Sequence, residues 1–334
     1  MRGLPEAIDK LISVEFRRDG VHDGVIEPLY AAARRLIGSP LAFTAAERLR
    51  EVAQTGATVY IATGHVHPVA LPMGETDGPP GAAALARSLV GFTAAPVVLL
   101  CEPAVVPVLR RTCTAAGLIV RPDPSLLPLP RSVAIVPFPI DPASAFTMAK
   151  ELAVTAGAVV TIEKVGPSDD GRYRTASGTD VTDSLSKVDY LVTAAHDAGC
   201  LTIGIGDLGN EIGMGLIRDT VQEVVSTGRV VGCTVPTDVL VVAGCSNWGA
   251  YGVAAGLAAL ERNVDLLHTA VIERAMITEC CLAGGVDGFS CGPTLEVDGA
   301  SYRTHMAFVR LLRDVVAISI DSRRPARHQL EGVR

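Results

Sequence analysis

The stretch 201–215, LTIGIGDLGNEIGMG, decides the predicted fold. Its first five residues form a short apolar run that is typical of a buried strand, and a glycine-rich, acidic loop follows at once. Helical spacing of apolar residues then runs from about Glu211 to Ser226. A strand that passes through a tight polar loop into a helix is the repeating unit of α/β proteins.

The same alternation extends to both sides of this stretch. Strands separated by helices of this length pair in parallel, which predicts a Rossmann-like, three-layer α/β fold. Its mostly parallel sheet carries helices on both faces, and the active site lies at the carboxyl ends of the strands. In one predicted helix, Thr44 and Glu47 have the spacing of a capping box. The other predicted strands are residues 57–62, 96–101, 133–136, 158–163 and 239–243, and the other predicted helices are 5–18, 25–37, 44–54, 81–90, 102–116, 141–155, 182–196 and 250–262.

One α/β catalytic domain is predicted over residues 1–320. Within it, residues 264–320 are a candidate sub-domain, because they follow the last predicted strand–helix unit. Residues 321–334, DSRRPARHQLEGVR, are rich in charge and are predicted to form a solvated tail.

Composition excludes several classes of protein. The 334 residues are 49% hydrophobic and carry a net charge of −7, which counts against a nucleic-acid partner. Eight cysteines include no CxxC pair and several lie in apolar runs, which indicates a reducing compartment. The chain starts without the apolar core of a signal peptide, and no apolar run approaches the ~18 residues of a membrane span. We therefore expect a cytoplasmic protein with no membrane segment, and we leave a homo-oligomer open.

Four polar, glycine-rich loops directly follow predicted buried strands. They are residues 63–77, 164–180, 206–215 and 244–249. Because the carboxyl ends of parallel strands share one edge of the sheet, these loops are expected to face one ligand crevice. This convergence predicts an enzyme that acts on a small molecule.

The loop at 206–215 matches GxGxxG through Gly204, Gly206 and Gly209 but is too acidic for a dinucleotide. A pyrophosphate there would meet Asp207 and Glu211, and such repulsion costs about 4 kcal/mol at ~4 Å near a protein surface. We therefore predict no organic cofactor. Carboxylate and amide oxygens suit Mg²⁺ or Mn²⁺ instead, which makes Asp207 and Glu211 candidate metal ligands. The predicted catalytic residues of this loop are Asp207, Asn210 and Glu211.

The loop at 63–77 supplies two more acids, Glu75 and Asp77, just before a helix. They are candidates for holding a metal or a substrate ammonium. In the alternative interpretation, Asp77 is an N-cap and Glu75 complements the helix dipole. His65 and His67 lack a metal-site spacing and are predicted to be structural or solvent-facing.

The remaining loops offer groups that could orient a substrate. Lys164 or Arg172 could bind a carboxylate, and the long loop 164–180 is a candidate lid. Trp248 could form the wall of a pocket, although a lone tryptophan is more often part of a core. The predicted substrate-contacting residues are Thr63, Gly64, Lys164, Asp170, Arg172, Tyr173, Gly206, Gly209, Ser246, Asn247 and Trp248.

Several runs, taken in order, resemble one family. ETDGPPGA (75–82), DGRY (170–173), TIGIGDLGNEIGMG (202–215), AGCSNWGAYG (243–252) and the two VDG segments (286–288 and 297–299) are similar to the C-terminal domain of D-glutamate cyclases and their free-standing bacterial relatives. The resemblance covers roughly residues 5–320. It implies a carbon–oxygen lyase that converts D-glutamate to 5-oxo-D-proline and water.

The resemblance also suggests roles. Asp207, Asn210 and Glu211 would act at the reacting carboxyl, with Glu75 or Asp77 near the amine and Lys164 or Arg172 at the α-carboxylate. Three positions depart from the usual family pattern: Leu208 replaces a glycine, Pro167 an arginine, and His65 a commonly aromatic residue. The alternatives are therefore a lactam-forming or lactam-hydrolysing enzyme for a different amino acid, or a non-catalytic amino-acid-binding protein.

Overall fold

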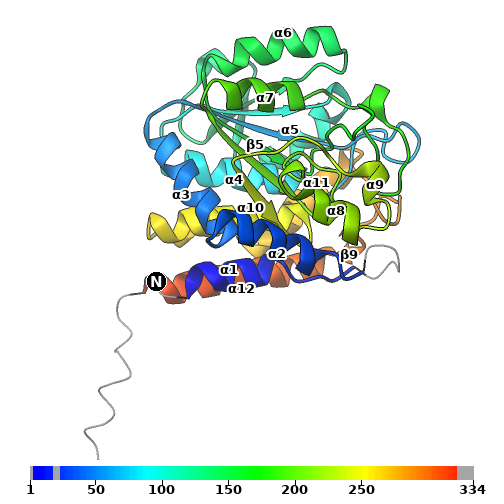
Figure 1. Ribbon diagram of the computed structural model, residues 1–334. Coiled ribbons are helices and arrows are strands. Elements are labelled where there is room, and N and C mark those ends of the chain that lie inside the picture. The colour runs from blue at the N-terminus through cyan, green and yellow to red at the C-terminus, as the bar shows by residue number, and fades with distance from the viewer. Residues whose placement is uncertain (1–2, 18–22, 322–334) are drawn as a thin grey trace, which may run out of the picture.

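The computed structural model describes residues 3–17 and 23–321 and places a seven-stranded sheet at the centre of the molecule (Figure 1). The strand order is β3-β4-β2-β1-β5-β6-β7, and every neighbouring pair is parallel. The predicted α/β fold class is therefore confirmed. The strands are β1 (Thr58–Thr63), β2 (Val97–Cys101), β3 (Ile119–Arg121), β4 (Ser132–Pro137), β5 (Ala156–Ile162), β6 (Leu201–Gly206) and β7 (Val239–Val242).

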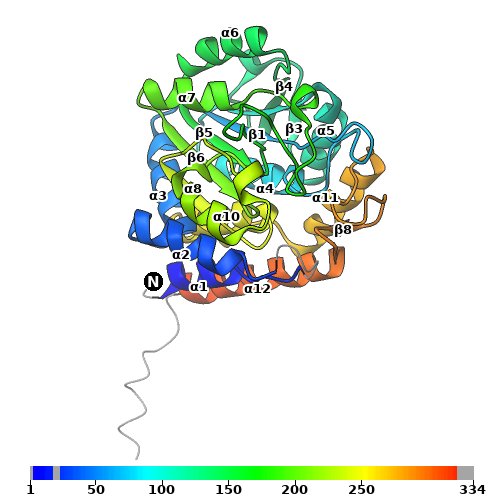
Figure 2. The same ribbon diagram turned by 45° about the vertical axis from the view of Figure 1, so that its right-hand side comes forward.

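Helices cover both faces of this sheet. In Figures 1 and 2, α6 and α7 lie on one face, while α3, α4 and α10 lie on the other, with α1 and α12 outside α10. Among the residues that the structure describes, no helix has both the length and the hydropathy needed to cross a membrane. The helices are α1 (Leu4–Ile12), α2 (Ile26–Ile37), α3 (Leu41–Gln54), α4 (Pro79–Val90), α5 (Val106–Ala115), α6 (Pro142–Ala153), α7 (Asp189–Asp197), α8 (Arg218–Val224), α9 (Gly228–Val231), α10 (Ser246–Leu260), α11 (Ala270–Leu282) and α12 (Tyr302–Ile320).

The small residues of α10 explain how helices pack so closely with so few aromatic side chains. This helix, SNWGAYGVAAGLAAL, is buried along almost its whole length. A Cβ on Gly256 would lie 2.5 Å from the Cβ of Ala46 in α3, and one on Gly252 would lie 2.8 Å from Cγ2 of Ile12 in α1. Real Cβ contacts are longer than this, so glycine permits the close approach of three helices.

The loop after β6 differs from its prediction because hydrogen bonds within the loop hold it in a non-helical conformation. The helix expected from Glu211 starts only at Arg218. The Glu211 carboxylate accepts the backbone N–H groups of Asp207 (3.0 Å), Leu208 (2.9 Å) and Gly209 (2.8 Å), which holds the chain in a tight irregular turn. A Cβ on Gly206 would lie 2.9 Å from the Glu211 side chain, so glycine at this position leaves room for the turn.

Other element boundaries also shift. The predicted helix at 5–18 ends at Ile12, and the one expected from residue 182 starts at Asp189. The predicted capping box at Thr44 is wrong, because α3 begins at Leu41 and the Thr44 hydroxyl donates to the Pro40 carbonyl at 2.8 Å. The short edge strand β3 was not predicted; it has only three residues, and all of them are at least partly exposed.

The order of the strands creates a crevice beside β1. After β1 the chain forms β2, β3 and β4 on one side of β1, and it then returns to the other side of β1 with β5. In open parallel sheets, such a reversal leaves a gap between the connecting segments at the carboxyl ends of the strands. The residues that follow β1 and β5 therefore flank this gap.

The C-terminal segment 264–320 closes over the same edge. Its helix α11 packs on α5, its helix α12 packs on α1 and α10, and a short hairpin, β8 (Glu296–Val297) and β9 (Ala300–Ser301), lies between them. The hydroxyl of Thr76 donates to the Glu296 carbonyl at 2.8 Å, which joins the loop after β1 to this hairpin. The predicted tail beyond Asp321 lies outside the described residues.

Candidate active site

A cavity of about 360 Å³ lies at the carboxyl ends of β1, β5 and β6. Loops from distant parts of the sequence form its wall, including residues 175–177 and 179 of the predicted lid and residues 288 and 289 of the C-terminal segment. Four carboxylates and, among the described residues, three basic side chains line it. The acids are Glu75, Glu163, Asp207 and Asp298, and the bases are Arg17, His65 and His67.

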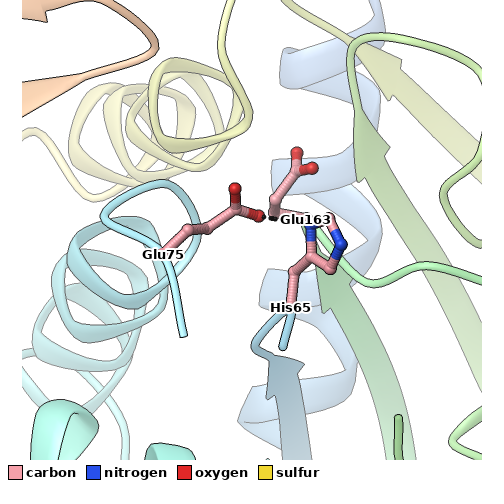
Figure 3. A group of neighbouring side chains, drawn as sticks. All are labelled: His65, Glu75 and Glu163. Carbon is pink, nitrogen blue, oxygen red and sulfur yellow. Dashed lines mark hydrogen bonds and ion pairs between the residues drawn. The ribbon is translucent and has the colours of Figure 1, made fainter. Parts of the chain in front are cut away.

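His65, Glu75 and Glu163 meet at the crevice between β1 and β5 (Figure 3). His65 Nδ1 lies 2.9 Å from Glu75 Oε1, and His65 Nε2 is buried without a partner. Burial alone would lower the pKa of His65, but the Glu75 carboxylate outweighs it and raises that pKa. The sequence predicted a structural or solvent-facing role for His65, whereas the structure places it in the cavity wall.

Glu163 is a site residue that sequence reasoning missed. It directly follows β5 and has a φ of 49°, in the left-handed region that non-glycine residues rarely adopt. The opposing Gly78 leaves the necessary space, since a Cβ there would lie 3.1 Å from the Glu163 Cβ. Strained backbone of this kind is common at functional sites. The available signal was a glutamate at the end of an apolar strand, beside a glycine-rich loop.

The surroundings of Glu163 favour its protonated form. Burial, followed by the charges of Asp207 and other nearby acids, raises its pKa well above the usual range. The Ser246 hydroxyl donates to Glu163 Oε2 at 2.6 Å. A carboxyl group that keeps its proton near neutral pH can act as a general acid.

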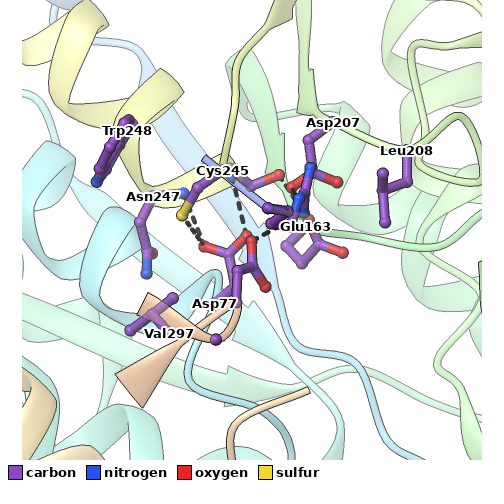
Figure 4. Close-up of polar contacts among 12 residues, drawn as sticks. Asp77, Glu163, Asp207, Leu208, Cys245, Asn247, Trp248 and Val297 are labelled. Atoms are coloured by element: carbon purple, nitrogen blue, oxygen red, sulfur yellow. Dashed lines mark hydrogen bonds and ion pairs between the residues drawn. The ribbon is translucent and has the colours of Figure 1, made fainter. Parts of the chain in front are cut away.

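Asp77 and Asn247 cap each other's helices (Figure 4). Asp77 accepts the backbone N–H groups of Ser246 (2.9 Å) and Asn247 (2.8 Å), at the start of α10. In return, Asn247 Oδ1 accepts the N–H groups of Gly78 (3.0 Å) and Gly81 (2.6 Å), at the start of α4. Asp77 is thus a helix cap, as the alternative interpretation proposed, but for a helix far away in the sequence. This exchange fixes both helices at the edge of the cavity.

Asp77 also belongs to the electrostatics of the site. Burial, with the charges of Asp207 and Glu75, raises its pKa to about 7. The neighbouring Cys245 thiol lies 3.3 Å from Asp77 Oδ1, and burial raises the pKa of this thiol well above its usual value. A protonated, buried thiol is a poor nucleophile, so the cysteine is not a candidate for covalent catalysis.

The Arg17 side chain lies in the cavity wall and contacts two acids. Its Nη1 donates to Asp207 Oδ2 at 2.8 Å and to Asp298 Oδ2 at 3.0 Å. Arg17 Nη2 and Asp207 Oδ1 are buried and have no partner. Neither Arg17 nor Asp298 was predicted as a site residue, because their contact joins opposite ends of the chain.

The acids of the cavity fit a divalent cation. Ligand atoms of His65, Glu75 and Glu163 lie within 4.8 Å of one another, and so do those of Asp77, Glu163 and Asp207. The unpartnered His65 Nε2 and Asp207 Oδ1 would gain a partner from such an ion. Oxygen and imidazole ligands of this kind suit Mg²⁺ or Mn²⁺. Asp207 therefore fits its predicted role as a metal ligand, whereas the other predicted ligand, Glu211, belongs to none of the groups among the described residues.

Lys164 does not reach the cavity. Its ammonium group is fully buried, donates to the Gly64 carbonyl at 2.9 Å and pairs with Glu102. A Cβ on Gly64 would lie 2.4 Å from Glu102 Oε2, so Gly64 leaves space for this ion pair. The adjacent Thr63 is also buried and does not line the cavity. These residues support the loop after β1 from behind.

Two charged residues of the predicted lid lie on the surface instead. Arg172 pairs with Asp180 at 3.0 Å, and Asp170 pairs with Arg174 at 2.6 Å. Of the two remaining predicted residues nearby, Asn210 lines the cavity and donates through Nδ2 to the Arg174 carbonyl at 2.9 Å, whereas the Glu211 carboxylate is used within its own turn. The lid segment therefore contributes its tip to the cavity, and its ion pairs stabilise its stem.

Two predicted aromatic contacts belong to the core. The Tyr173 hydroxyl donates to Asp189 at 2.5 Å, behind the lid. Trp248 points away from the acids in Figure 4, donates to His305 Nδ1 at 2.9 Å and stacks on Phe308 with ring centroids 4.0 Å apart. The structure thus favours the core interpretation of this lone tryptophan.

Comparisons with known proteins bear on this site. A family model described as "D-glutamate cyclase-like, C-terminal" matches residues 25–313. The human protein "D-glutamate cyclase, mitochondrial" is 38% identical over 100 residues, which are 30% of this chain and 16% of that protein. Among solved structures, RecJ in complex with Mn²⁺ from Thermus thermophilus aligns with 92% of this chain and 43% of that one, at 13% identity and a TM-score of 0.33. A score this low does not establish a shared fold.

Proposed function

The chain belongs to the D-glutamate cyclase-like, C-terminal family, and from this premise we propose that it is a lyase that converts D-glutamate to 5-oxo-D-proline and water. The observation that carries the proposal is the pairing of two acids in one cavity. Glu163 favours its protonated form, and Asp207 offers an unpartnered carboxylate oxygen. Ligand atoms of these residues lie within 4.8 Å of each other.

The reaction needs both kinds of acid. The α-amine forms a C–N bond with the γ-carboxyl carbon, and one C–O bond of that carboxyl breaks. The ammonium group gives up two protons, and the departing oxygen leaves as water. Asp207 Oδ1 accepts the first proton from the amine, and the Glu163 carboxyl supplies a proton to the departing oxygen. The second amine proton passes to the same oxygen, which completes the water, and the proton on Asp207 then returns to Glu163. This arrangement places Asp207 at the amine, where the sequence suggested Glu75 or Asp77.

The cavity also contributes to the reaction by positioning the two reacting groups of the substrate. Binding holds the amine and the γ-carboxyl of one substrate molecule in contact, so the entropy cost of folding the flexible substrate chain is met on binding and does not add to the barrier. When bound, Mg²⁺ or Mn²⁺ would act as a Lewis acid on the reacting carboxyl. His65 and Glu75 would hold it, because they take no part in the proposed proton transfers.

One departure from the family pattern supports a second candidate, a lactam-forming or lactam-hydrolysing enzyme for a different amino acid. Leu208 lines the cavity beside Asp207, where the family usually has glycine (Figure 4). Its side chain reduces the space and makes the wall more apolar. Pro167 lies outside the cavity, and its carbonyl accepts the Thr234 N–H at 2.9 Å, so this second departure does not bear on substrate contact.

The proposal is tested by incubating purified protein with D-glutamate and L-glutamate and following 5-oxoproline by chiral chromatography. Parallel samples contain Mn²⁺ or EDTA. We expect product from the D-isomer and a lower rate with EDTA. No product from D-glutamate, together with turnover of another amino acid, would favour the second candidate. Binding without any turnover would indicate an amino-acid-binding protein.

A further inference from the structure

We propose that Arg17 and Asp207 form the head-group site of the cavity, in which Arg17 binds the substrate's α-carboxylate while Asp207 receives its α-amine. The inference rests on the proposed function and deepens it by naming the residues that bind the α-carboxylate and the α-amine of the substrate. It assigns the α-carboxylate to a residue outside the family motifs, in place of Lys164 and Arg172.

Charge shows why such a residue is needed. An acidic amino acid carries two carboxylates into a cavity that already holds four. Of the three basic side chains in the described wall, His65 is paired with Glu75. His67 Nδ1 accepts the backbone N–H groups of Val69 (3.2 Å) and Ala70 (3.0 Å), which orients its ring within a local turn. Arg17 is the remaining cation, and one nitrogen of its guanidinium has no acceptor.

Arg17 is also charged and held in place. A guanidinium stays protonated in folded proteins, and Arg17 lies within hydrogen-bond distance of two acids, so the group is charged. Its side chain is only 4% exposed, and both acids hold the same nitrogen, Nη1. Leaving a buried charged donor unpaired is unfavourable, and a carboxylate ligand would remove that cost.

The two unpartnered atoms belong to side chains that are bonded to each other. Arg17 donates to Asp207 Oδ2, which leaves Arg17 Nη2 as a free donor and Asp207 Oδ1 as a free acceptor. An amino-acid head group presents the complementary pair, a carboxylate acceptor beside an ammonium donor. The same arrangement explains why the amine would lie at Asp207 in the proposed reaction.

The test compares ligands with and without the carboxylate. Binding of 5-oxo-D-proline and of its amide is measured by calorimetry, and turnover is measured with D-glutamate and its α-amide. Losing one charge-assisted hydrogen bond is expected to weaken binding by about 100-fold, so the wild type should prefer the carboxylate in each pair by that factor. Arg17→Gln combined with Asp298→Asn removes the cation together with one acid, which avoids leaving both acids unpaired, and should reduce the preference to within about threefold.

Two further variants separate binding from folding. Arg17→Lys keeps a positive charge next to Asp207 but loses the planar guanidinium that can form two parallel hydrogen bonds with a carboxylate. It should therefore raise KM more than it changes kcat. Arg111→Gln removes an exposed arginine that pairs with Glu279 and should behave as the wild type. Melting temperatures of all variants establish that each is folded at the assay temperature.

Each outcome is decisive. A double variant that is folded and keeps the wild-type preference for the carboxylate would overturn the assignment. Arg17-dependent binding of 5-oxo-D-proline without turnover of D-glutamate would support the head-group site and count against the proposed reaction. A wild type that neither binds these ligands nor turns over D-glutamate would overturn both proposals.

Discussion

The sharpest single perturbation of this site is Glu163→Gln. Glutamine has nearly the shape of a protonated glutamate, and its side-chain carbonyl can still accept the Ser246 hydroxyl that now donates to Glu163 at 2.6 Å. The change therefore removes the transferable proton and leaves the packing and the strained backbone at this position intact. Because general acid catalysis contributes about 10²–10⁴-fold, kcat should fall by that factor, which corresponds to about 3–5.5 kcal/mol at 1.36 kcal/mol per tenfold.

The assay for this variant is the rate of 5-oxo-D-proline formation at saturating D-glutamate, with KM measured in the same series. Glu279→Gln is a matched control, since it changes the same residue type in a surface ion pair with Arg111. Melting temperature should change little, or rise at alkaline pH, because the variant lacks a buried acid that must ionise there. A folded Glu163→Gln variant with kcat within about threefold of the wild type would refute the role of Glu163 as proton donor.

Three further predictions concern stability and selectivity. The Asp77 pKa is raised from 3.8 to about 7, so the folded state binds the extra proton and wild-type stability should fall as pH rises through that window. Asp77→Asn should be less stable than the wild type by about 1 kcal/mol at pH 4, because its helix cap is weaker, and this difference in stability should be smaller at pH 8. A difference that grows with pH in thermal melts would contradict the prediction. Lys164→Met should lower the free energy of unfolding, measured in urea, by about 3–5 kcal/mol, because it leaves the Glu102 carboxylate buried without its ion-pair partner. The double variant Lys164→Met, Glu102→Gln should regain most of this stability, and no recovery would show that the ion pair is not the cause. Leu208→Gly should raise kcat/KM for D-glutamate relative to smaller or more apolar amino acids, because it adds space and removes an apolar side chain from the cavity wall; an unchanged ratio would show that Leu208 does not determine specificity.

The fold was predictable because its signal is local. Short apolar runs alternate with helical ones along the chain, and each predicted strand is present in the sheet. The position of the site followed from the same pattern, since loops after parallel strands meet at one edge. Glu75 and Asp207, two of the acids predicted from these loops, line the cavity.

The details of the site depend on contacts that no local pattern carries. Arg17 meets Asp298 across 281 positions of sequence, and only the folded chain brings them together. Glu163 was counted as the last residue of a strand, where its change to a left-handed backbone conformation leaves no mark in composition. Lys164 and Arg172 have suitable chemistry for a carboxylate, but their ion pairs with Glu102 and Asp180 hold them elsewhere.

The most direct test of the account compares wild-type protein with the Glu163→Gln, Asp207→Asn double variant in a chiral assay of 5-oxoproline from D-glutamate. Both proteins are purified identically, and melting curves establish that each is folded. We predict product from the wild type and a rate at least about 10³-fold lower from the double variant, because both the proton donor and the proton acceptor are lost. Equal rates from the two proteins, or no product from the wild type, would contradict the claim that the buried acids of this cavity close the lactam ring.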